Sequence, residues 1–135
     1  MIARGVVFDS SAVVAMMTRE ASAMSLTEQL EVMRPRLISA GTVLEVSLVL
    51  QQRFGESADL LVDDFLHAFS VEVVAFDAAQ LRMARDASRR FGRGRHRAAL
   101  NYGDCFSYAL AMTRGLPLLF VGEEFAQTDV HALTS

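Results

Sequence analysis

The stretch that decides the fold class is Val6-Val7-Phe8-Asp9-Ser10-Ser11-Ala12, close to the start of the chain. Residues 5–8 are small or apolar and predict a short buried strand, and the apolar residues 12–17 predict a helix immediately after it. Ser10 or Ser11 can cap this helix, because a hydroxyl oxygen there accepts a hydrogen bond from a free backbone amide. A strand that leads directly into a helix is the basic unit of an α/β protein.

The same alternation continues along the rest of the chain. The predicted elements after the first helix are, in order, a helix over 21–33, a strand over 37–40, helices over 42–55 and 57–69, a strand over 71–76, a helix over 77–91, a helix from 102 or 104 to 113, a strand over 117–121 and a possible edge strand near 129–130. Strands separated by helices are joined by right-handed crossovers and therefore lie parallel. We predict an α/β fold, specifically a three-layer α/β/α sandwich with a mostly parallel central sheet of four to five strands.

Local signals mark the ends of these helices. Pro35 stops the helix over 21–33, and Gly55 and Gly115 end two later helices. Asp77 and Gln80 have the spacing of a capping box. In the helix that begins at residue 42, the apolar pattern predicts five buried side chains: Val43, Leu44, Val46, Val49 and Leu50.

Composition limits the class of protein. A chain of 135 residues without a linker-like segment predicts one domain over residues 1–135. With 52% hydrophobic residues and a mean hydropathy of +0.27, the chain has more apolar surface than a small monomer easily hides, so we expect a homodimer or another protein partner. Cys105 is the single cysteine, which excludes an intrachain disulfide and suits a reducing compartment. Without a signal peptide or a membrane-spanning stretch, we expect a soluble, cytoplasmic protein.

Basic charge is concentrated in one segment, although the net charge of the chain is −3. All 13 basic residues are arginine, and seven of them fall within residues 82–97, where Asp86 is the only acid. A local basic stripe, rather than the net charge, marks a surface for a nucleic-acid backbone. We predict that Arg93, Arg95 and Arg97 bind phosphates, and the alternative is an ordinary solvated helix face.

Four acidic residues lie at borders between predicted elements: Asp9, Glu45, Asp104 and Glu124. Because the carboxyl ends of parallel strands share one edge of a sheet, these side chains should meet in one crevice. Two carboxylates about 5 Å apart repel by roughly 3 kcal/mol at an effective dielectric of about 20, so a cluster of four needs a cation or takes up protons. We predict a site for a hard divalent metal ion with oxygen ligands.

Each acid also has a purely structural interpretation. Asp9 could cap the helix that follows it, and Thr42 with Glu45 has the spacing of a capping box. Asp104 could interact favourably with the dipole of its helix from the first turn. Capping alone does not explain why the acidic pair 123–124 reaches the same edge of the sheet.

Other chemistries have less support from the sequence. Cys105 has no histidine in a catalytic arrangement near it, so a cysteine nucleophile is disfavoured. His67, His96 and His131 do not have the spacing of metal ligands. A phosphoryl-accepting receiver domain also places acids at strand ends, but that chemistry uses a lysine and the sequence has none.

Five short motifs stand in a characteristic order and spacing: Val7-Phe8-Asp9-Ser10-Ser11-Ala12, Ile38-Ser39-Ala40-Gly41-Thr42-Val43-Leu44-Glu45, Arg90-Phe91-Gly92-Arg93-Gly94-Arg95-His96, Asn101-Tyr102-Gly103-Asp104-Cys105-Phe106 and Pro117-Leu118-Leu119-Phe120-Val121-Gly122. Together they resemble the PIN-domain ribonucleases, specifically the VapC toxins of bacterial type II toxin-antitoxin systems, over nearly the whole chain. The resemblance implies an α/β/α sandwich and a single-strand endoribonuclease that depends on Mg²⁺ or Mn²⁺. It also implies inhibition by a cognate VapB-type antitoxin.

The resemblance assigns roles by position. It makes Asp9, Glu45 and Asp104 the core metal-site acids. Glu124 takes the place of an aspartate, since relatives usually have Gly-Asp-Asp-Phe or Gly-Asn-Asp-Phe there, and one additional methylene changes its reach. Ser11 would position the first aspartate by hydrogen bonding, or would simply cap the helix. A further departure is residue 121, a valine where relatives often carry lysine, so one phosphate contact is missing.

The resulting hypothesis is a toxin that cleaves single-stranded or loop RNA by metal-activated water. Its catalytic and metal-binding residues would be Asp9, Glu45, Asp104 and Glu124, and its RNA clamp Arg93, Arg95 and Arg97. The expected partners are a VapB-type antitoxin, the RNA substrate and a second copy of the chain. The alternative is a catalytically silent PIN-like protein-interaction module.

Overall fold

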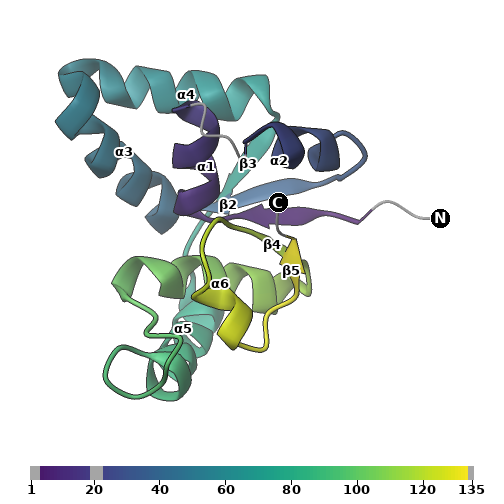
Figure 1. Ribbon diagram of the computed structural model, residues 1–135, viewed down its shortest axis with the longest axis vertical. Coiled ribbons are helices and arrows are strands. Elements are labelled where there is room, and N and C mark those ends of the chain that lie inside the picture. The colour runs from purple at the N-terminus through teal and green to yellow at the C-terminus, as the bar shows by residue number, and fades with distance from the viewer. Residues whose placement is uncertain (1–3, 19–22, 134–135) are drawn as a thin grey trace.

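A parallel sheet of five short strands forms the centre of the structure, a computed structural model that describes residues 4–18 and 23–133. The strand order is β3-β2-β1-β4-β5 (Figure 1). The strands are β1 (Val6–Phe8), β2 (Arg36–Ser39), β3 (Val71–Val74), β4 (Leu118–Leu119) and β5 (Ala132–Leu133). Because every pairing between them is parallel, their carboxyl ends meet at one edge of the sheet.

Helices cover both faces of this sheet and give three layers (Figure 1). One face carries α1 (Ser10–Met17), α2 (Ala23–Leu30), α3 (Ala40–Phe54) and α4 (Ala58–Ala68), and the other carries α5 (Ala78–Phe91) and α6 (Tyr102–Arg114). Two short 3-10 turns, η1 (Gly55–Ser57) and η2 (Phe125–Gln127), complete the fold. The predicted three-layer α/β/α sandwich is therefore confirmed.

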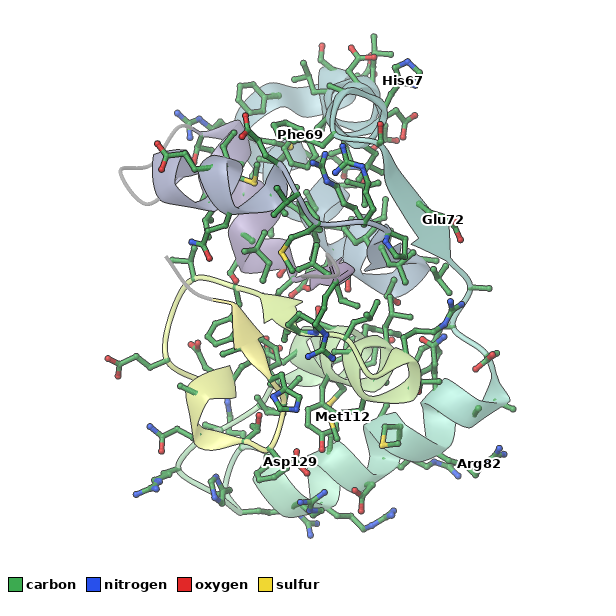
Figure 2. All side chains as sticks on the ribbon, turned by 90° about the vertical axis from the view of Figure 1, so that its right-hand side faces the viewer. His67, Phe69, Glu72, Arg82, Met112 and Asp129 are labelled. Atoms are coloured by element: carbon green, nitrogen blue, oxygen red, sulfur yellow. The ribbon has the colours of Figure 1, made fainter. Side chains whose placement is uncertain are left out.

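Two apolar clusters fill the space between the sheet and the helices. Val6 and Phe8 of β1 enter the cluster under α1–α4, whereas Val7 between them enters the cluster against α5 and α6. Phe69 and Met112 mark these two sides in Figure 2, one packed against each cluster. Because β1 is buried on both faces, its sequence is a continuous apolar run rather than an alternating one.

The helix caps at two borders decide between the predicted alternatives. The N-cap of α1 is Asp9, whose carboxylate accepts the backbone amide of Ser11, so the prediction that Ser10 or Ser11 caps this helix is wrong. The physical reason is that the chain already turns helical at Ser10, directly after the strand. At α5 the predicted cap is present, because Asp77 accepts the amide of Gln80 at 2.9 Å.

Helix α3 begins earlier than the sequence suggests. Ser39, the last residue of β2, caps it by accepting the amide of Gly41 at 3.2 Å. The predicted capping box of Thr42 and Glu45 is therefore wrong, since both residues already lie inside the helix. The hydroxyl of Thr42 is left free to contact another part of the protein.

The outer face of α3 is more apolar than predicted. Leu44 and Val49, which we expected to be buried, are 61% and 48% exposed. The residues that face the core are Val46 and Leu50, one helical turn apart. Leu44, with Leu48 one turn further, lies on a different side and faces solvent. Helix α3 therefore carries two stripes of apolar residues, and the sequence pattern alone did not show which of them faces the core.

Smaller differences concern the ends of elements. Helix α2 ends at Leu30, short of the predicted residue 33, and residues 21–22 of that prediction lie outside the described part of the chain. The last strand is formed by Ala132–Leu133 instead of residues 129–130. Gly55 and Gly115 do end α3 and α6, with φ angles of 60° and 63° that favour glycine. Within the described residues, no helix is long and apolar enough to cross a membrane.

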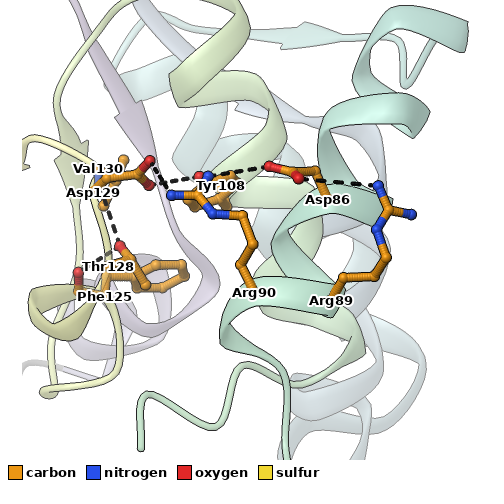
Figure 3. A network of polar contacts seen from close by, with 8 residues as sticks. All are labelled: Asp86, Arg89, Arg90, Tyr108, Phe125, Thr128, Asp129 and Val130. Carbon is orange, nitrogen blue, oxygen red and sulfur yellow. Dashed lines mark hydrogen bonds and ion pairs between the residues drawn. The ribbon is translucent and has the colours of Figure 1, made fainter. Parts of the chain in front are cut away.

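A polar network fastens the segment between η2 and β5 to the helices (Figure 3). The Tyr108 hydroxyl of α6 donates to Oδ1 of Asp129 at 2.6 Å. Arg90 of α5 bridges Oδ2 of Asp129 at 3.0 Å and Oδ2 of Asp86 at 3.1 Å. Burial, together with the hydrogen bond to Asp129, raises the pKa of Tyr108. The network therefore holds two helices and the C-terminal segment in one arrangement.

Candidate active site

All four predicted carboxylates line one cavity of about 360 Å³: Asp9, Glu45, Asp104 and Glu124. The cavity lies where the first residues after β1 meet the N-terminal turns of α3 and α6. Ser10, Ser11 and Asn101 add polar groups to its wall, and Arg93 adds a positive charge. Parallel pairing thus brings together side chains that are far apart in the sequence.

Asp9 is the most rigidly held of the four acids. It is 2% exposed, and its Oδ2 accepts the Ser11 hydroxyl at 2.6 Å and the Ser11 amide at 3.0 Å. Its Oδ1 accepts the hydroxyl of Ser107 at 2.6 Å. Burial raises the pKa of Asp9, and the hydrogen bonds from Ser107 and Ser11 oppose that rise. Ser11 in turn accepts the amide of Val121, which connects Asp9 to the end of β4.

Glu45 projects from α3 with one oxygen unpaired. Its Oε1 is buried and has no hydrogen-bond partner. Burial raises the pKa of Glu45, and the negative charge of Asp9 adds to the rise, while the hydroxyl of Ser10 opposes it. A side chain at Gly103 would occupy the place of the Glu45 carboxylate, so glycine at that position makes room for the acid. A buried unpaired carboxylate oxygen is costly unless a ligand satisfies it.

Asp104 serves two purposes at the start of α6. Its carboxylate accepts the amide of Asn101 at 3.0 Å, and Asn101 accepts the amide of Asp104 at 2.9 Å, which makes a capping box. Burial raises the pKa of Asp104 to about 7, and repulsion from Asp9, Glu124 and Glu45 contributes to the rise. Asp104 therefore makes a capping contact within its own helix, where the sequence suggested an interaction with the helix dipole, and it also lines the cavity.

Glu124 lies at the exposed rim of the cavity. The chain reaches it through Gly122, whose φ of 117° is a conformation that side chains rarely adopt. The next residue, Phe125, is buried against Phe120 with ring centroids 5.2 Å apart, and this anchors the turn. Glu123, in contrast, does not line the cavity.

The predicted arginine clamp is only partly at the cavity. Arg93 lines it, whereas Arg95 and Arg97 are exposed on the same turn without lining it. Arg82 projects outward from α5 (Figure 2). Arg90 is engaged in the network of Figure 3. Among the predicted arginines, Arg93 therefore has the most direct access to a phosphate bound beside the carboxylates.

Comparison with known proteins gives the family. The model of the PIN domain matches residues 6–130. A protein of Mycolicibacterium smegmatis named ribonuclease VapC is 50% identical over 127 residues, which cover 94% of this chain and 98% of that protein. The chain belongs to the VapC family of PIN-domain proteins. The resemblance predicted from the five motifs is confirmed.

Solved VapC structures share the fold. The structure of Mycobacterium tuberculosis VapC20, described as a sarcin-ricin loop cleaving toxin, superposes with a TM-score of 0.77 at 16% identity and covers 97% of this chain and 100% of that one. VapBC2 from Rickettsia felis, bound to a DNA fragment from its promoter, gives a TM-score of 0.75 at 15% identity, with 95% and 96% covered. The VapC fold is thus retained at low sequence identity.

The carboxylates of this VapC-family chain suit a divalent metal ion. The four acids at the cavity offer only oxygen donors, which Mg²⁺ and Mn²⁺ prefer. The unpaired Oε1 of Glu45 and the mutual repulsion felt at Asp104 are both relieved by a cation. As they stand, no three acidic, histidine or cysteine side chains of the described residues converge to the spacing of metal ligands, so binding an ion would require these carboxylates to move closer together.

Sequence reasoning missed two hydroxyls beside this site. Ser107 and Thr42 are fully buried, and Ser107 contacts Asp9 directly. The available signal was spacing: Ser107 follows Asp104 by three residues, and Thr42 precedes Glu45 by three, so each shares a helix face with an acid. In contrast, Cys105, His67, His96 and His131 do not line the cavity.

Proposed function

We propose that this chain is an endoribonuclease of the VapC type, whose four carboxylates hold divalent metal, Mg²⁺ or Mn²⁺. The observation that carries the proposal is the convergence of Asp9, Glu45, Asp104 and Glu124 on one cavity, with a buried oxygen of Glu45 unpaired. A relative with 50% identity is named a ribonuclease, and its match extends over nearly all of both chains. We also propose that the protein acts in the cytoplasm as the toxin of a toxin-antitoxin pair.

The residues divide the work between them. Asp9, Asp104 and Glu45 would bind the ion, and Glu124 at the rim would complete the site or bind a second ion. When bound, a divalent ion lowers the pKa of a water molecule and neutralises charge on a phosphate. Arg93 would hold a phosphate of the RNA by charge-assisted hydrogen bonds. The proposed nucleophile is water, and the products should then carry a 5′-phosphate and a 3′-hydroxyl.

The proposed protein partner is an antitoxin of the VapB type. Apolar side chains on the outer surface of α3 and α4 support a protein partner, among them Leu44, Leu48 and Leu60, which are 61%, 53% and 65% exposed. Contiguous apolar patches on a protein surface commonly mark a site where another protein binds. A second copy of the chain remains part of the proposed assembly, as a homodimer.

The test is a cleavage assay with a fluorescent single-stranded RNA and the purified chain. We expect cleavage with Mg²⁺ or Mn²⁺, none with a chelator, and none with Asp104→Asn. The matched control is Asp63→Asn, which changes an exposed acid of α4 and should cleave normally. A 2′,3′-cyclic phosphate at the product end would contradict the proposed water nucleophile. Absence of cleavage with both ions would favour the silent interaction module.

A further inference from the structure

A pair of buried hydroxyls lies against the carboxylate of Asp9. Ser107 of α6 and Thr42 of α3 are both fully buried, with their Oγ and Oγ1 atoms 3.2 Å apart. The Ser107 hydroxyl also lies 2.6 Å from Oδ1 of Asp9. Buried hydroxyl groups are nearly always hydrogen-bonded, and the carboxylate of Asp9 is the charged partner of this pair.

The direction of the hydrogen bonds follows from the groups themselves. An ionised carboxylate only accepts, so the single proton of Ser107 is donated to Asp9. The Ser107 oxygen then accepts, and the proton between the two hydroxyls comes from Thr42. The result is a directed chain of two hydrogen bonds that runs from Thr42 through Ser107 to Asp9.

The two hydroxyls occupy matching positions relative to the acids. Thr42 lies three residues before Glu45 on α3, and Ser107 lies three residues after Asp104 on α6. Residues three apart share a helix face. The chain of hydrogen bonds therefore joins the three elements that carry Asp9, Glu45 and Asp104 at one buried point.

The hydrogen bonds to Asp9 are divided unequally between its two carboxylate oxygens. Its Oδ2 accepts two hydrogen bonds, both from Ser11, whereas Oδ1 accepts one, from Ser107. A carboxylate oxygen has about two lone-pair directions. Of the hydrogen bonds donated by side chains, Oδ1 accepts only the one from Ser107.

We propose that Ser107 and Thr42 are positioning residues of the metal site: they fix Oδ1 of Asp9 and hold α3 and α6 at the spacing that the ion requires. This inference rests on the proposed function, because it concerns the same carboxylates. Hydrogen-bond partners of metal ligands commonly alter metal affinity or activity by about 10–100-fold when they are removed.

The experiment titrates Mn²⁺ alone into the full, metal-free chain by isothermal calorimetry. We expect Ser107→Ala to weaken Mn²⁺ binding by about 10–100-fold. Thr42→Val, which keeps the shape but removes the donor, should weaken it less, and Thr42→Ser, which keeps the hydroxyl, should bind like the wild type. The matched control is Ser47→Ala, since Ser47 is also a buried helical serine but donates to the carbonyl of Val43 in its own helix.

A second readout separates positioning from a merely structural contribution. With RNA as substrate, Ser107→Ala should lower kcat without changing KM, because Ser107 is too deeply buried to touch RNA. Saturating Mn²⁺ should restore kcat in this variant. A purely structural hydroxyl would instead lower thermal stability in the metal-free state and leave the Mn²⁺ affinity unchanged.

The outcomes distinguish this inference from the proposed function. Wild type that binds Mn²⁺, with Ser107→Ala and Thr42→Val binding equally well, overturns the inference alone. Wild type that does not bind Mn²⁺ overturns the proposed metal site and the inference with it. If Ser107→Ala fails to fold, the comparison of Thr42→Val with Thr42→Ser decides: equal affinities overturn the inference, and a loss confined to Thr42→Val supports it.

Discussion

Replacing Asp104 by asparagine should stabilise the metal-free protein at neutral and higher pH. Burial, with repulsion from the other three acids, raises the pKa of Asp104 from 3.8 to about 7. The folded state therefore holds a proton that the unfolded state has already lost, and stability falls as the pH rises from about 4 to about 7. Above that range the folded protein carries the full cost of the charge, which Asp104→Asn removes.

The size of the effect follows from the shift. The whole change in pKa would correspond to roughly 4 kcal/mol if Asp104 were completely buried. Because the residue is only partly buried, solvent screens the repulsion, and we expect a gain of about 1–2 kcal/mol in the free energy of unfolding at pH 8. The asparagine oxygen can still accept the amide of Asn101, so the cap of α6 should survive.

The assay is urea unfolding in the presence of a chelator at several pH values between 4 and 8. The difference between variant and wild type should vanish near pH 4, where the wild-type carboxyl is protonated in the folded protein. Saturating Mn²⁺ should stabilise the wild type by mass action, by about 2.7 kcal/mol at 100 times Kd, and the variant much less. A variant less stable than the wild type at pH 8, or a constant difference across the pH range, would refute the reasoning.

Three further predictions concern single contacts. Asp9→Asn should abolish cleavage and keep the fold, whereas Asp9→Ala should lose about 1 kcal/mol more stability in urea unfolding because Asp9 is also the N-cap of α1. Equal stabilities of these two variants would contradict the role of Asp9 as the N-cap of α1. Arg93→Ala should weaken binding of a non-cleaved RNA analogue more than Arg97→Ala does, and should reduce the salt dependence of binding more, because of these two arginines only Arg93 lines the cavity. Equal effects of the two variants in a salt titration would argue against a contact between Arg93 and the RNA. Tyr108→Phe should cost about 1–2 kcal/mol in thermal or urea unfolding by leaving Oδ1 of Asp129 without its donor, and an unchanged midpoint would show that the contact of Arg90 with Oδ2 is enough to hold the segment.

The sequence was sufficient for the fold and for the position of the carboxylates because both depend on regular patterns. A buried strand followed at once by a helix, as around Asp9, leaves few arrangements for the backbone. Asp9 directly follows β1, so it lies at the carboxyl edge of the parallel sheet. The start of α6 lies at the same edge because this helix leads back to the beginning of the parallel strand β4, and Asp9 and Asp104 therefore line one cavity although they are far apart in the chain.

What escaped prediction depends on contacts between elements. The start of α3 could be assigned to Ser39 or Thr42 by capping rules alone, and the choice of Ser39 frees Thr42 to meet Ser107. Leu44 was expected inside because α3 carries two apolar stripes, and only packing determines which one faces the core. Spacing alone would likewise have placed Arg93, Arg95 and Arg97 together, yet the turn brings only Arg93 to the cavity.

The four carboxylates differ in how firmly they are held, and this bears on the choice of ion. Hydrogen bonds from serines fix Asp9, and the capping box fixes Asp104, whereas Glu45 has a free oxygen and Glu124 stands at the exposed rim. Mg²⁺ demands nearly ideal octahedral geometry, and larger ions accept a more variable shell. In the proposed metal site, two rigid acids beside two adaptable ones would allow the radius of the site to adjust to the ion. Selectivity among divalent ions should therefore be set by the reach of Glu45 and Glu124, and shortening Glu124 would change the preferred ion.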